Sequence, residues 1–334
     1  MNVTTTAWLI TLAAIFILLT IDFVATRNPH DVSFREAAGW SVFYIAAAVA
    51  FGIWVWVRSG SEFGTEYFAA YLVEKSLSVD NLFVFAIILT QFAVPSILHQ
   101  RVLLVGILLA LAMRAVFIAV GAAALQAFSF TFVLFGALLI WTGIQLARHS
   151  NEDPEPGDNF VVKMARRRFP FTDDYDGARL FSKVDGRRMA TPMLLVMIAI
   201  GSTDLLFALD SIPATFGVTS EPFLVFAANA FALLGLRALY FLLKGLLDRL
   251  VYLSIGLAAI LGFIGVKLIL TYIHEVNEAW PKIPTGVSLS VIALILTVVS
   301  VASLVATKRN PELHAHAGRM TDSSRDETDQ TAQN

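Results

Sequence analysis

Long apolar runs separated by short polar segments dominate the hydrophobic pattern of the chain. Most runs hold about 20 residues, the length that an α-helix needs to cross the hydrocarbon core of a bilayer. The pattern therefore predicts an all-α, polytopic membrane protein with about nine transmembrane helices. The predicted spans are Trp8–Val24, Gly39–Val57, Tyr67–Val94, Val102–Leu125, Phe128–Leu146, Pro192–Thr215, Pro222–Leu243, Leu250–Tyr272 and Gly286–Ala306.

The polar segments between these spans predict the orientation of the chain. With nine spans, eighteen lysines and arginines fall on one side of the membrane, and only Arg58 and Lys282 fall on the other. Basic residues accumulate in cytoplasmic segments, so we expect the N-terminus outside and the C-terminus inside a cell (plasma or inner) membrane. The segment 148–190 is then a cytoplasmic loop whose basic run Lys163–Arg168 can lie along lipid headgroups. Residues 307–334 are expected to form a disordered cytoplasmic tail.

Composition excludes several classes of protein. The chain is 57% hydrophobic and 15% charged with a mean hydropathy of +0.71, which is too apolar for an ordinary soluble domain. It contains no cysteine, so disulfides, thiolate metal sites and a cysteine nucleophile are excluded. It has no phosphate loop, nucleophile elbow or dinucleotide fingerprint, so we expect neither an enzyme nor a bound cofactor. The expected partner is the lipid bilayer, not nucleic acid, and the sequence identifies no protein partner.

One predicted span carries far more polar chemistry than hydrocarbon tolerates. The stretch Glu74–Asn81 holds two carboxylates, a lysine and an asparagine within two helical turns. Charges inside a membrane are costly unless they face a bundle interior, a partner charge or a water-filled path. Glu74, Ser78 and Asn81 share one face of the predicted helix, and Asp80 lies on the same side. We therefore expect this face to point into the protein.

The acidic pattern returns in a later span. Ser202-Thr203-Asp204-Leu205-Leu206-Phe207 aligns with Ser78-Val79-Asp80-Asn81-Leu82-Phe83, and an arginine follows each aspartate at nearly the same distance, Arg114 and Arg237. Each unit contains three spans, an odd number, so the two copies must face opposite ways across the membrane. The sequence thus predicts two inverted three-helix repeats, with a site near the midplane at their interface. The predicted units are a two-helix addition at 1–66, repeat 1 at 67–147, the loop at 148–190, repeat 2 at 191–274, a ninth helix at 275–306 and the tail at 307–334.

The polar residues inside the spans supply mainly oxygen ligands. Carboxylate, amide, hydroxyl and carbonyl oxygens, without thiolate or mid-span imidazole, suit hard cations such as Mn²⁺, Mg²⁺ and Ca²⁺. The candidate metal ligands are Glu74, Asp80, Asn81, Asp204 and Asp210. The candidate supporting residues are Ser78, Arg114, Asn229, Arg237 and Lys267.

A purely structural interpretation of the same charges stays open. The four intramembrane acids and the four bases Lys75, Arg114, Arg237 and Lys267 could neutralise one another and bind nothing. We expect the two arginines to be ion-pair partners of those acids. Asp22, near the end of the first span, is expected to be an interfacial cap.

These residues resemble the motifs of the TerC family of integral membrane proteins. The resemblance rests on Glu74-x-x-x-Ser78-x-Asp80-Asn81 and on the stretches Thr203–Ala214 and Asn229–Leu243. It implies efflux of Mn²⁺ or a related divalent cation, a historical label of tellurium resistance, and metal binding by the five candidate ligands. One position departs from the family, because Gly201 stands where many members have a glutamate.

We therefore expect an exporter of a hard divalent cation, with Mn²⁺ as the first candidate, that works by alternating access through an intramembrane carboxylate site. One alternative is a membrane scaffold of a tellurium or metal stress-resistance complex, assembled through the loop and the tail. Another is an oxyanion (tellurite) transporter in which Arg114 and Arg237 are the ligands. Neutralising the acids should inactivate the cation exporter, whereas neutralising the arginines should inactivate the anion carrier.

Overall fold

A computed structural model describes residues 3–25, 32–148, 160–168, 170–184, 187–243, 251–277, 280–281 and 283–309. The side chain of Asp80 lies outside the described part, as do residues 149–159 of the predicted loop and 310–334 of the predicted tail. The helices are α1 (Thr5–Ala25), α2 (Phe34–Ser59), α3 (Ser61–Gln91), α4 (Ser96–Ala127), α5 (Thr131–Arg148), α6 (Phe160–Arg168), α7 (Pro192–Phe216), α8 (Pro222–Leu234), α9 (Leu236–Leu243), α10 (Leu253–Val276) and α11 (Thr285–Arg309). The strands are β1 (Phe181–Val184) and β2 (Arg187–Ala190).

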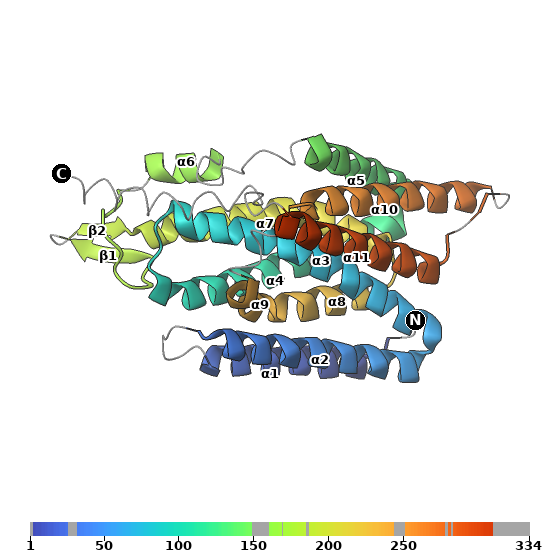
Figure 1. Cartoon of the computed structure of the whole chain (residues 1–334), viewed down its shortest axis with the longest axis horizontal. Coiled ribbons are helices and arrows are strands. Elements are labelled where there is room, and N and C mark those ends of the chain that lie inside the picture. Colours follow the sequence, from blue (N-terminus) through green and yellow to red (C-terminus); the bar gives the residue numbers. More distant parts are fainter. Residues whose placement is uncertain are drawn as a thin grey trace.

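The long helices run side by side along the long axis of the molecule (Figure 1). In the described ranges, eight helical segments are long and apolar enough to cross a membrane, with α8 and α9 counted as one segment. The 31-residue α3 is not among the eight, because acidic and basic residues occur along its length. The prediction of an all-α, polytopic membrane protein is thereby confirmed, and α3 corresponds to the charged span of the predicted set.

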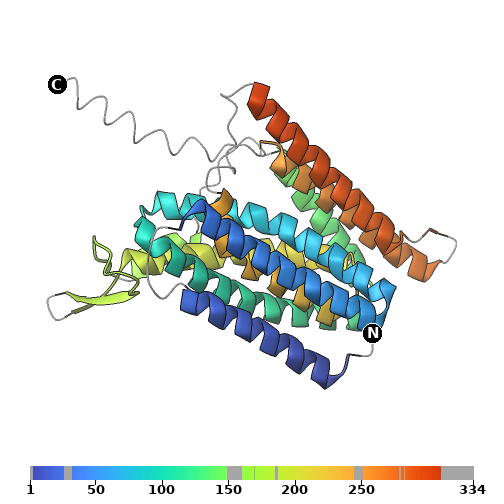
Figure 2. The same cartoon turned by 60° about the horizontal axis from the view of Figure 1, so that its bottom comes forward.

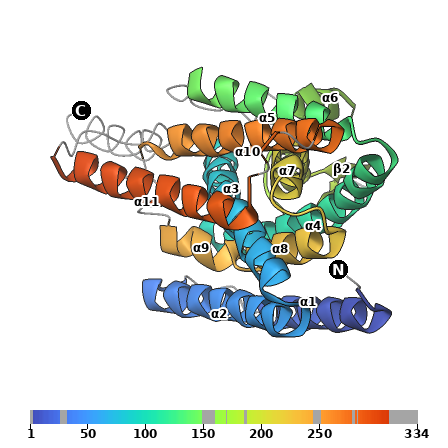
Figure 3. The same ribbon diagram turned by 90° about the vertical axis from the view of Figure 1, so that its right-hand side faces the viewer.

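The charged helix α3 lies in the middle of the bundle (Figure 3). It packs against α2, α7, α8, α9, α10 and α11. Other helices expose large apolar side chains that can face lipid, for example Phe16 of α1 and Leu294 of α11. Burying its polar face against so many helices is what allows α3 to carry charges at this depth.

Glycines bring α5 and α10 into backbone contact. A Cβ atom built on Gly136 would lie 2.7 Å from the carbonyl oxygen of Gly265, and one built on Gly265 would lie 2.7 Å from that of Gly136. A Cβ atom on Gly143 would lie 3.0 Å from the carbonyl oxygen of Ala258. Small residues that let helix backbones approach this closely are typical of packing within membranes.

The predicted span Pro222–Leu243 is interrupted at Gly235, so that α8 and α9 are two helices. A Cβ atom at Gly235 would lie 3.1 Å from Tyr44 Cβ and 3.3 Å from Lys75 Nζ, so a side chain there would require these neighbours to shift slightly. The Lys75 ammonium donates a hydrogen bond to the carbonyl oxygen of Ala232 at 3.3 Å. A positive charge is favourable there, since it lies at the carboxyl end of α8.

The predicted loop contains more structure than a bare connector. Its basic run lies in α6, where Val162 and Ala165 are buried, and β1 and β2 pair antiparallel as a hairpin beyond the helix ends (Figure 2). The Tyr175 hydroxyl donates to the carbonyl oxygen of Phe92 at 2.7 Å, which ties the loop to the end of α3. The hairpin is the part of the described chain that departs from the all-α expectation.

Candidate intramembrane ion site

Three fully buried charges meet where α7 packs against both α3 and α4. Arg114 of α4 donates from Nη1 to Glu74 Oε2 of α3 at 2.9 Å and from Nη2 to Asp204 Oδ1 of α7 at 3.2 Å. The exposed fractions of these side chains are 0% for Arg114, 0% for Glu74 and 1% for Asp204. Residues of the two predicted repeats therefore share one closed polar centre, which we call the Arg114 cluster: Glu74, Asn81, Arg114, Asp204 and Thr215.

The two uncharged members of the Arg114 cluster complete its hydrogen bonds. With its amide oriented to suit its neighbours, Asn81 accepts from Arg114 Nη2 at 2.8 Å and donates to the Leu77 carbonyl oxygen at 3.2 Å. The Thr215 hydroxyl lies 2.9 Å from Glu74 Oε1 and 2.8 Å from the Ser211 carbonyl oxygen, so it shares one proton between two acceptors. Glu74 is thus bonded through both of its oxygens.

Several buried polar atoms around the cluster have no hydrogen-bond partner among the described residues. They are Asp204 Oδ2, Arg114 Nε, Ser78 Oγ and Ser211 Oγ. Ser78 is one turn from Glu74, and Ser211 is two turns from Asp204, so each hydroxyl lies on the same helix face as the acid. Buried polar groups are normally satisfied, and clusters of exceptions point to an unseen water, ion or ligand.

The charges of the Arg114 cluster do not balance within its triad. Two carboxylates face one guanidinium, which leaves one negative charge in excess when both acids are ionised. The neighbouring Lys75 donates instead to the Ala232 carbonyl oxygen of α8. Because an uncompensated buried charge costs several kcal/mol, this arrangement favours uptake of a proton or a cation.

Not all predicted site residues join the cluster. Asp210 faces another helix and lies within hydrogen-bonding reach of Thr142 on α5. Lys267 lines a separate cavity, and Asn229 is buried on α8. The Asp80 backbone belongs to α3, but its side chain lies outside the described part of the chain.

Asp22 is not an interfacial cap, and Arg237 pairs with it instead of with Glu74, Asp204 or Asp210, the predicted site acids whose side chains are described. Asp22 is 2% exposed, and its Oδ1 accepts from Arg237 at 2.7 Å and from the Tyr44 hydroxyl at 2.8 Å. This second centre joins α1, α2 and α9. The expectation for Asp22 was wrong because Tyr44 of α2 and Arg237 of α9 bind and enclose a carboxylate that lies at the end of an apolar run.

Gly201 of α7 lies against Leu109 of α4. A Cβ atom built on Gly201 would lie 2.9 Å from Leu109 Cδ2. A larger side chain there would require Leu109 to move.

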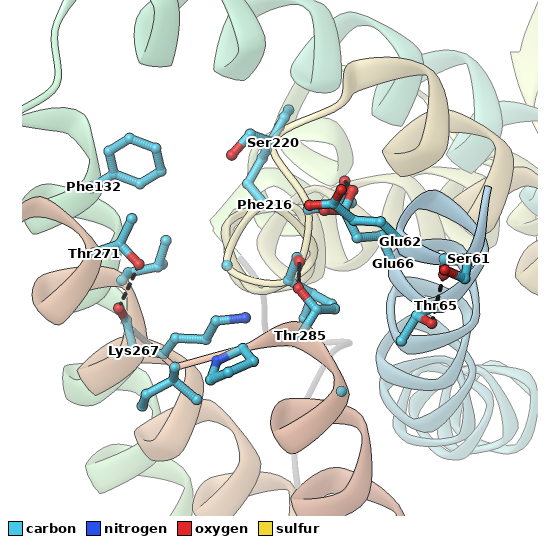
Figure 4. Close-up of a pocket in the computed structure, with 17 residues that line it drawn as sticks. Ser61, Glu62, Thr65, Glu66, Phe132, Phe216, Ser220, Lys267, Thr271 and Thr285 are labelled. Atoms are coloured by element: carbon cyan, nitrogen blue, oxygen red, sulfur yellow. Dashed lines mark hydrogen bonds between the residues drawn. The ribbon is translucent and has the colours of Figure 1, made fainter. Parts of the chain in front are cut away.

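A cavity of about 450 Å³ lies at the end of the bundle where α3 and α11 begin and α7 ends. Glu62 and Glu66 of α3 face Lys267 of α10 across it (Figure 4). Glu66 Oε2 accepts a hydrogen bond of 2.6 Å from the Thr219 hydroxyl.

Sequence reasoning missed three residues of these centres. Thr215 follows Ser211 by one turn on the helix that carries Asp204, and this spacing was the signal that could have found it. Tyr44 and Glu66 carried no comparable signal. Their partners Asp22 and Thr219 lie far away along the chain, and only the packed structure brings them together.

Comparison with known proteins gives a consistent result. The model of the family described as "Integral membrane protein TerC family" matches residues 59–311 of this chain. An uncharacterized membrane protein of Myxococcus xanthus is 41% identical over 94% of this chain and 96% of its own length. An uncharacterized membrane protein of Mycobacterium tuberculosis is 46% identical over 89% of this chain and 78% of its own. The chloroplastic thylakoid membrane protein TERC of Arabidopsis thaliana is 44% identical over 81% of this chain and 68% of its own. No solved structure matches.

Proposed function

Because the chain belongs to the TerC family of integral membrane proteins, we propose that it exports a hard divalent cation, with Mn²⁺ as the first candidate. The observation that carries this proposal is the Arg114 cluster, a closed centre with excess negative charge and unsatisfied oxygens. Such an oxygen-rich centre suits a hard cation. The cation is the transported substrate, and the proposal requires no resident cofactor.

Arg114 acts in this proposal as a counter-ion that yields to the substrate. In the closed arrangement its guanidinium neutralises Glu74 and Asp204. An arriving divalent cation takes over that role at Asp204 Oδ2, with the hydroxyls of Ser78 and Ser211 and the Asn81 amide as neutral ligands. Asp80 remains a predicted ligand of the same site, and Asp210 a predicted ligand or proton carrier.

Release on the outer side follows from proton competition. Carboxylates bind metal only when they are deprotonated, so a lower pH outside lowers the affinity for the cation. The proposal places the N-terminus outside and the C-terminus in the cytoplasm of the plasma or inner membrane, as the distribution of basic residues predicts.

Alternating access in this proposal depends on two inverted repeats. Near the end of each unit, Gly143-Ile144-Gln145-Leu146 aligns with Gly265-Val266-Lys267-Leu268, and the same offset places Gly136 opposite Ala258. The close approach of Gly136 to Gly265 then has its symmetric counterpart in the approach of Gly143 to Ala258, and both occur between α5 and α10. These paired contacts support a pseudo-two-fold relation between the units, although the division of the chain into repeats stays a prediction.

The two alternatives have weaker support. Both transmembrane arginines are already bonded to carboxylates, Arg114 to two and Arg237 to Asp22, so an oxyanion would have to displace acids from them. A scaffold would draw on the loop, whose α6 and hairpin lie at one end of the bundle, but such a role assigns nothing to the buried charges.

Transport of Mn²⁺ into everted vesicles tests the proposal. We expect Asp204→Asn and Glu74→Gln to abolish uptake, because each removes a buried carboxylate that the cation needs. Asp176→Asn is the matched control, because Asp176 lies in the loop with an exposed side chain and pairs there with Arg179. Normal uptake in both membrane variants, at normal amounts of protein, would refute the site. Loss of uptake only in Arg114→Gln, with both acids dispensable, would favour the oxyanion carrier.

A further inference from the structure

The cavity at the start of α3 is organised in two levels. At the outer level, near the helix ends, lie Glu62 of α3 and Thr271 of α10. One turn deeper on the same helices lie Glu66 and Lys267. The side chain of Lys267 is 5% exposed, and Figure 4 shows it pointing toward the carboxylates of α3. The cavity therefore has a polar outer level and a deeper level where the half-buried Glu66 carboxylate faces the buried Lys267.

A series of hydrogen bonds links the deep level of the cavity to the Arg114 cluster. Thr219 donates to Glu66 at 2.6 Å, and one turn earlier along the chain Thr215 donates to Glu74 at 2.9 Å. The amide of Thr219 in turn donates to the carbonyl oxygen of Thr215 at 3.1 Å. The same two segments, α3 and the stretch from Thr215 to Thr219, thus contact Glu66 in the cavity and Glu74 in the buried cluster.

The charges around the cavity favour a cation but not in its deepest part. Glu62 and Glu221 lie close enough to Glu66 to repel its carboxylate, and Lys267 lies close enough to attract it. A divalent cation in the cavity would relieve the repulsion among these acids. The ammonium of Lys267, however, repels the same cation at the deep level, between Glu66 and the route to Glu74.

We propose that this cavity is the outer vestibule of the cation route and that Lys267 closes its inner end. The inference rests on the proposed export function and extends it, because it identifies where the divalent cation leaves and which residue separates that place from the Arg114 cluster. Glu66 receives the cation after it leaves Glu74, and Lys267 must shift from Glu66 for the cation to pass.

Labelling of introduced cysteines tests the position of the vestibule. The chain contains no cysteine, so each variant carries a single thiol. Thr271→Cys places that thiol in the cavity, and Val266→Cys, on the same helix with 47% exposure, places it on the outer surface of the bundle. With a charged, impermeant methanethiosulfonate added outside spheroplasts, we expect Thr271→Cys to react roughly tenfold faster or more, because the reactive thiolate needs water. Added Mn²⁺ should slow this reaction, and Glu66→Gln should remove that protection.

Equal labelling of the two variants would overturn the vestibule. Labelling of Thr271→Cys only in everted vesicles would also overturn it, because the cavity would then open to the cytoplasm. Labelling that Mn²⁺ does not slow would leave an outer cavity that does not hold the cation, which equally contradicts the proposal.

A second pair of variants tests the role of Lys267. Thr215→Cys places the thiol beside Glu74, where the threonine is fully buried. We expect slow labelling from outside in this variant and labelling faster by about tenfold when Lys267→Gln is added, since the thiol gains access to water. Lys308→Gln, at the last turn of α11, removes the same charge elsewhere and should change nothing. Unchanged labelling with Lys267→Gln would refute the closure.

The outcome of the labelling experiments is independent of the outcome of the transport experiment. Mn²⁺ uptake that survives Asp204→Asn and Glu74→Gln refutes export through the Arg114 cluster, whatever the labelling shows. Uptake that requires the acids, together with an unlabelled Thr271→Cys, refutes only the vestibule.

Discussion

At the scale of single residues, the two buried acids bonded to Arg114 are not equivalent. Glu74 is bonded through both oxygens, to Arg114 and to Thr215, whereas Oδ2 of Asp204 has no partner within the described chain. Removing one partner of a buried ion pair is costly, because the other charge is left uncompensated. Glu74 therefore holds the arginine in place, and in the proposed site Oδ2 of Asp204 is the atom that we expect the cation to bind first.

The second buried centre makes a residue-scale prediction about stability. Asp22→Asn leaves the Arg237 guanidinium without its carboxylate, and we expect a loss of roughly 3–5 kcal/mol in the free energy of unfolding. Thermal unfolding of the purified protein in detergent measures this loss of stability. Adding Arg237→Gln should recover much of the loss, because no buried charge then remains unpaired. Asp176→Asn, at an exposed ion pair, should be nearly neutral. An Asp22→Asn protein as stable as the parent would show that the pair contributes nothing.

At the scale of helices, the contact between α5 and α10 depends on the absence of side chains. Gly265 approaches the Gly136 backbone so closely that even a methyl group would push the helices apart. A Cβ atom built on Gly262, three residues earlier on α10, would meet no described atom within 4 Å. The two glycines therefore provide a matched comparison on one helix.

We expect Gly265→Ala to destabilise the protein by roughly 1–3 kcal/mol, because overpacking against backbone cannot be relieved by a rotamer change. Gly262→Ala should be neutral or slightly stabilising, because alanine favours the helix more than glycine does. Thermal unfolding of the two variants side by side decides the matter. Equal stability of both variants would mean that α5 and α10 are not held at this distance.

The hydrophobic pattern predicts most of these helices, because membrane spans are long and strongly apolar. It does not predict the break at Gly235, where a Cβ atom would crowd Tyr44 and Lys75, two residues that lie far away along the chain. The repeat alignment indicates that α3 and α7 bring acids to a common place, and Glu74 and Asp204 do share Arg114. The pairing of Asp22 with Arg237 had no signal, because it arises from contacts between segments distant along the chain.

At the scale of the whole molecule, the buried charges form two centres, and each centre connects a different set of helices. The Arg114 cluster joins α3, α4 and α7, and the pair of Asp22 and Arg237 ties α1 to α9. In the proposed transport cycle the first centre opens and closes around the cation. The second stays intact and keeps the two N-terminal helices attached to the rest of the bundle.

The central claim is that the Arg114 cluster binds the cation, and direct binding tests it most directly. Electron paramagnetic resonance of free Mn²⁺, titrated with the purified protein in nanodiscs, measures affinity without transport. We predict binding by the parent protein that weakens as the pH falls. In Asp204→Asn we predict an affinity lower by at least about tenfold, the loss that even an outer-shell partner of a metal typically causes. Asp204→Asn protein that is folded and binds Mn²⁺ as tightly as the parent would contradict the account.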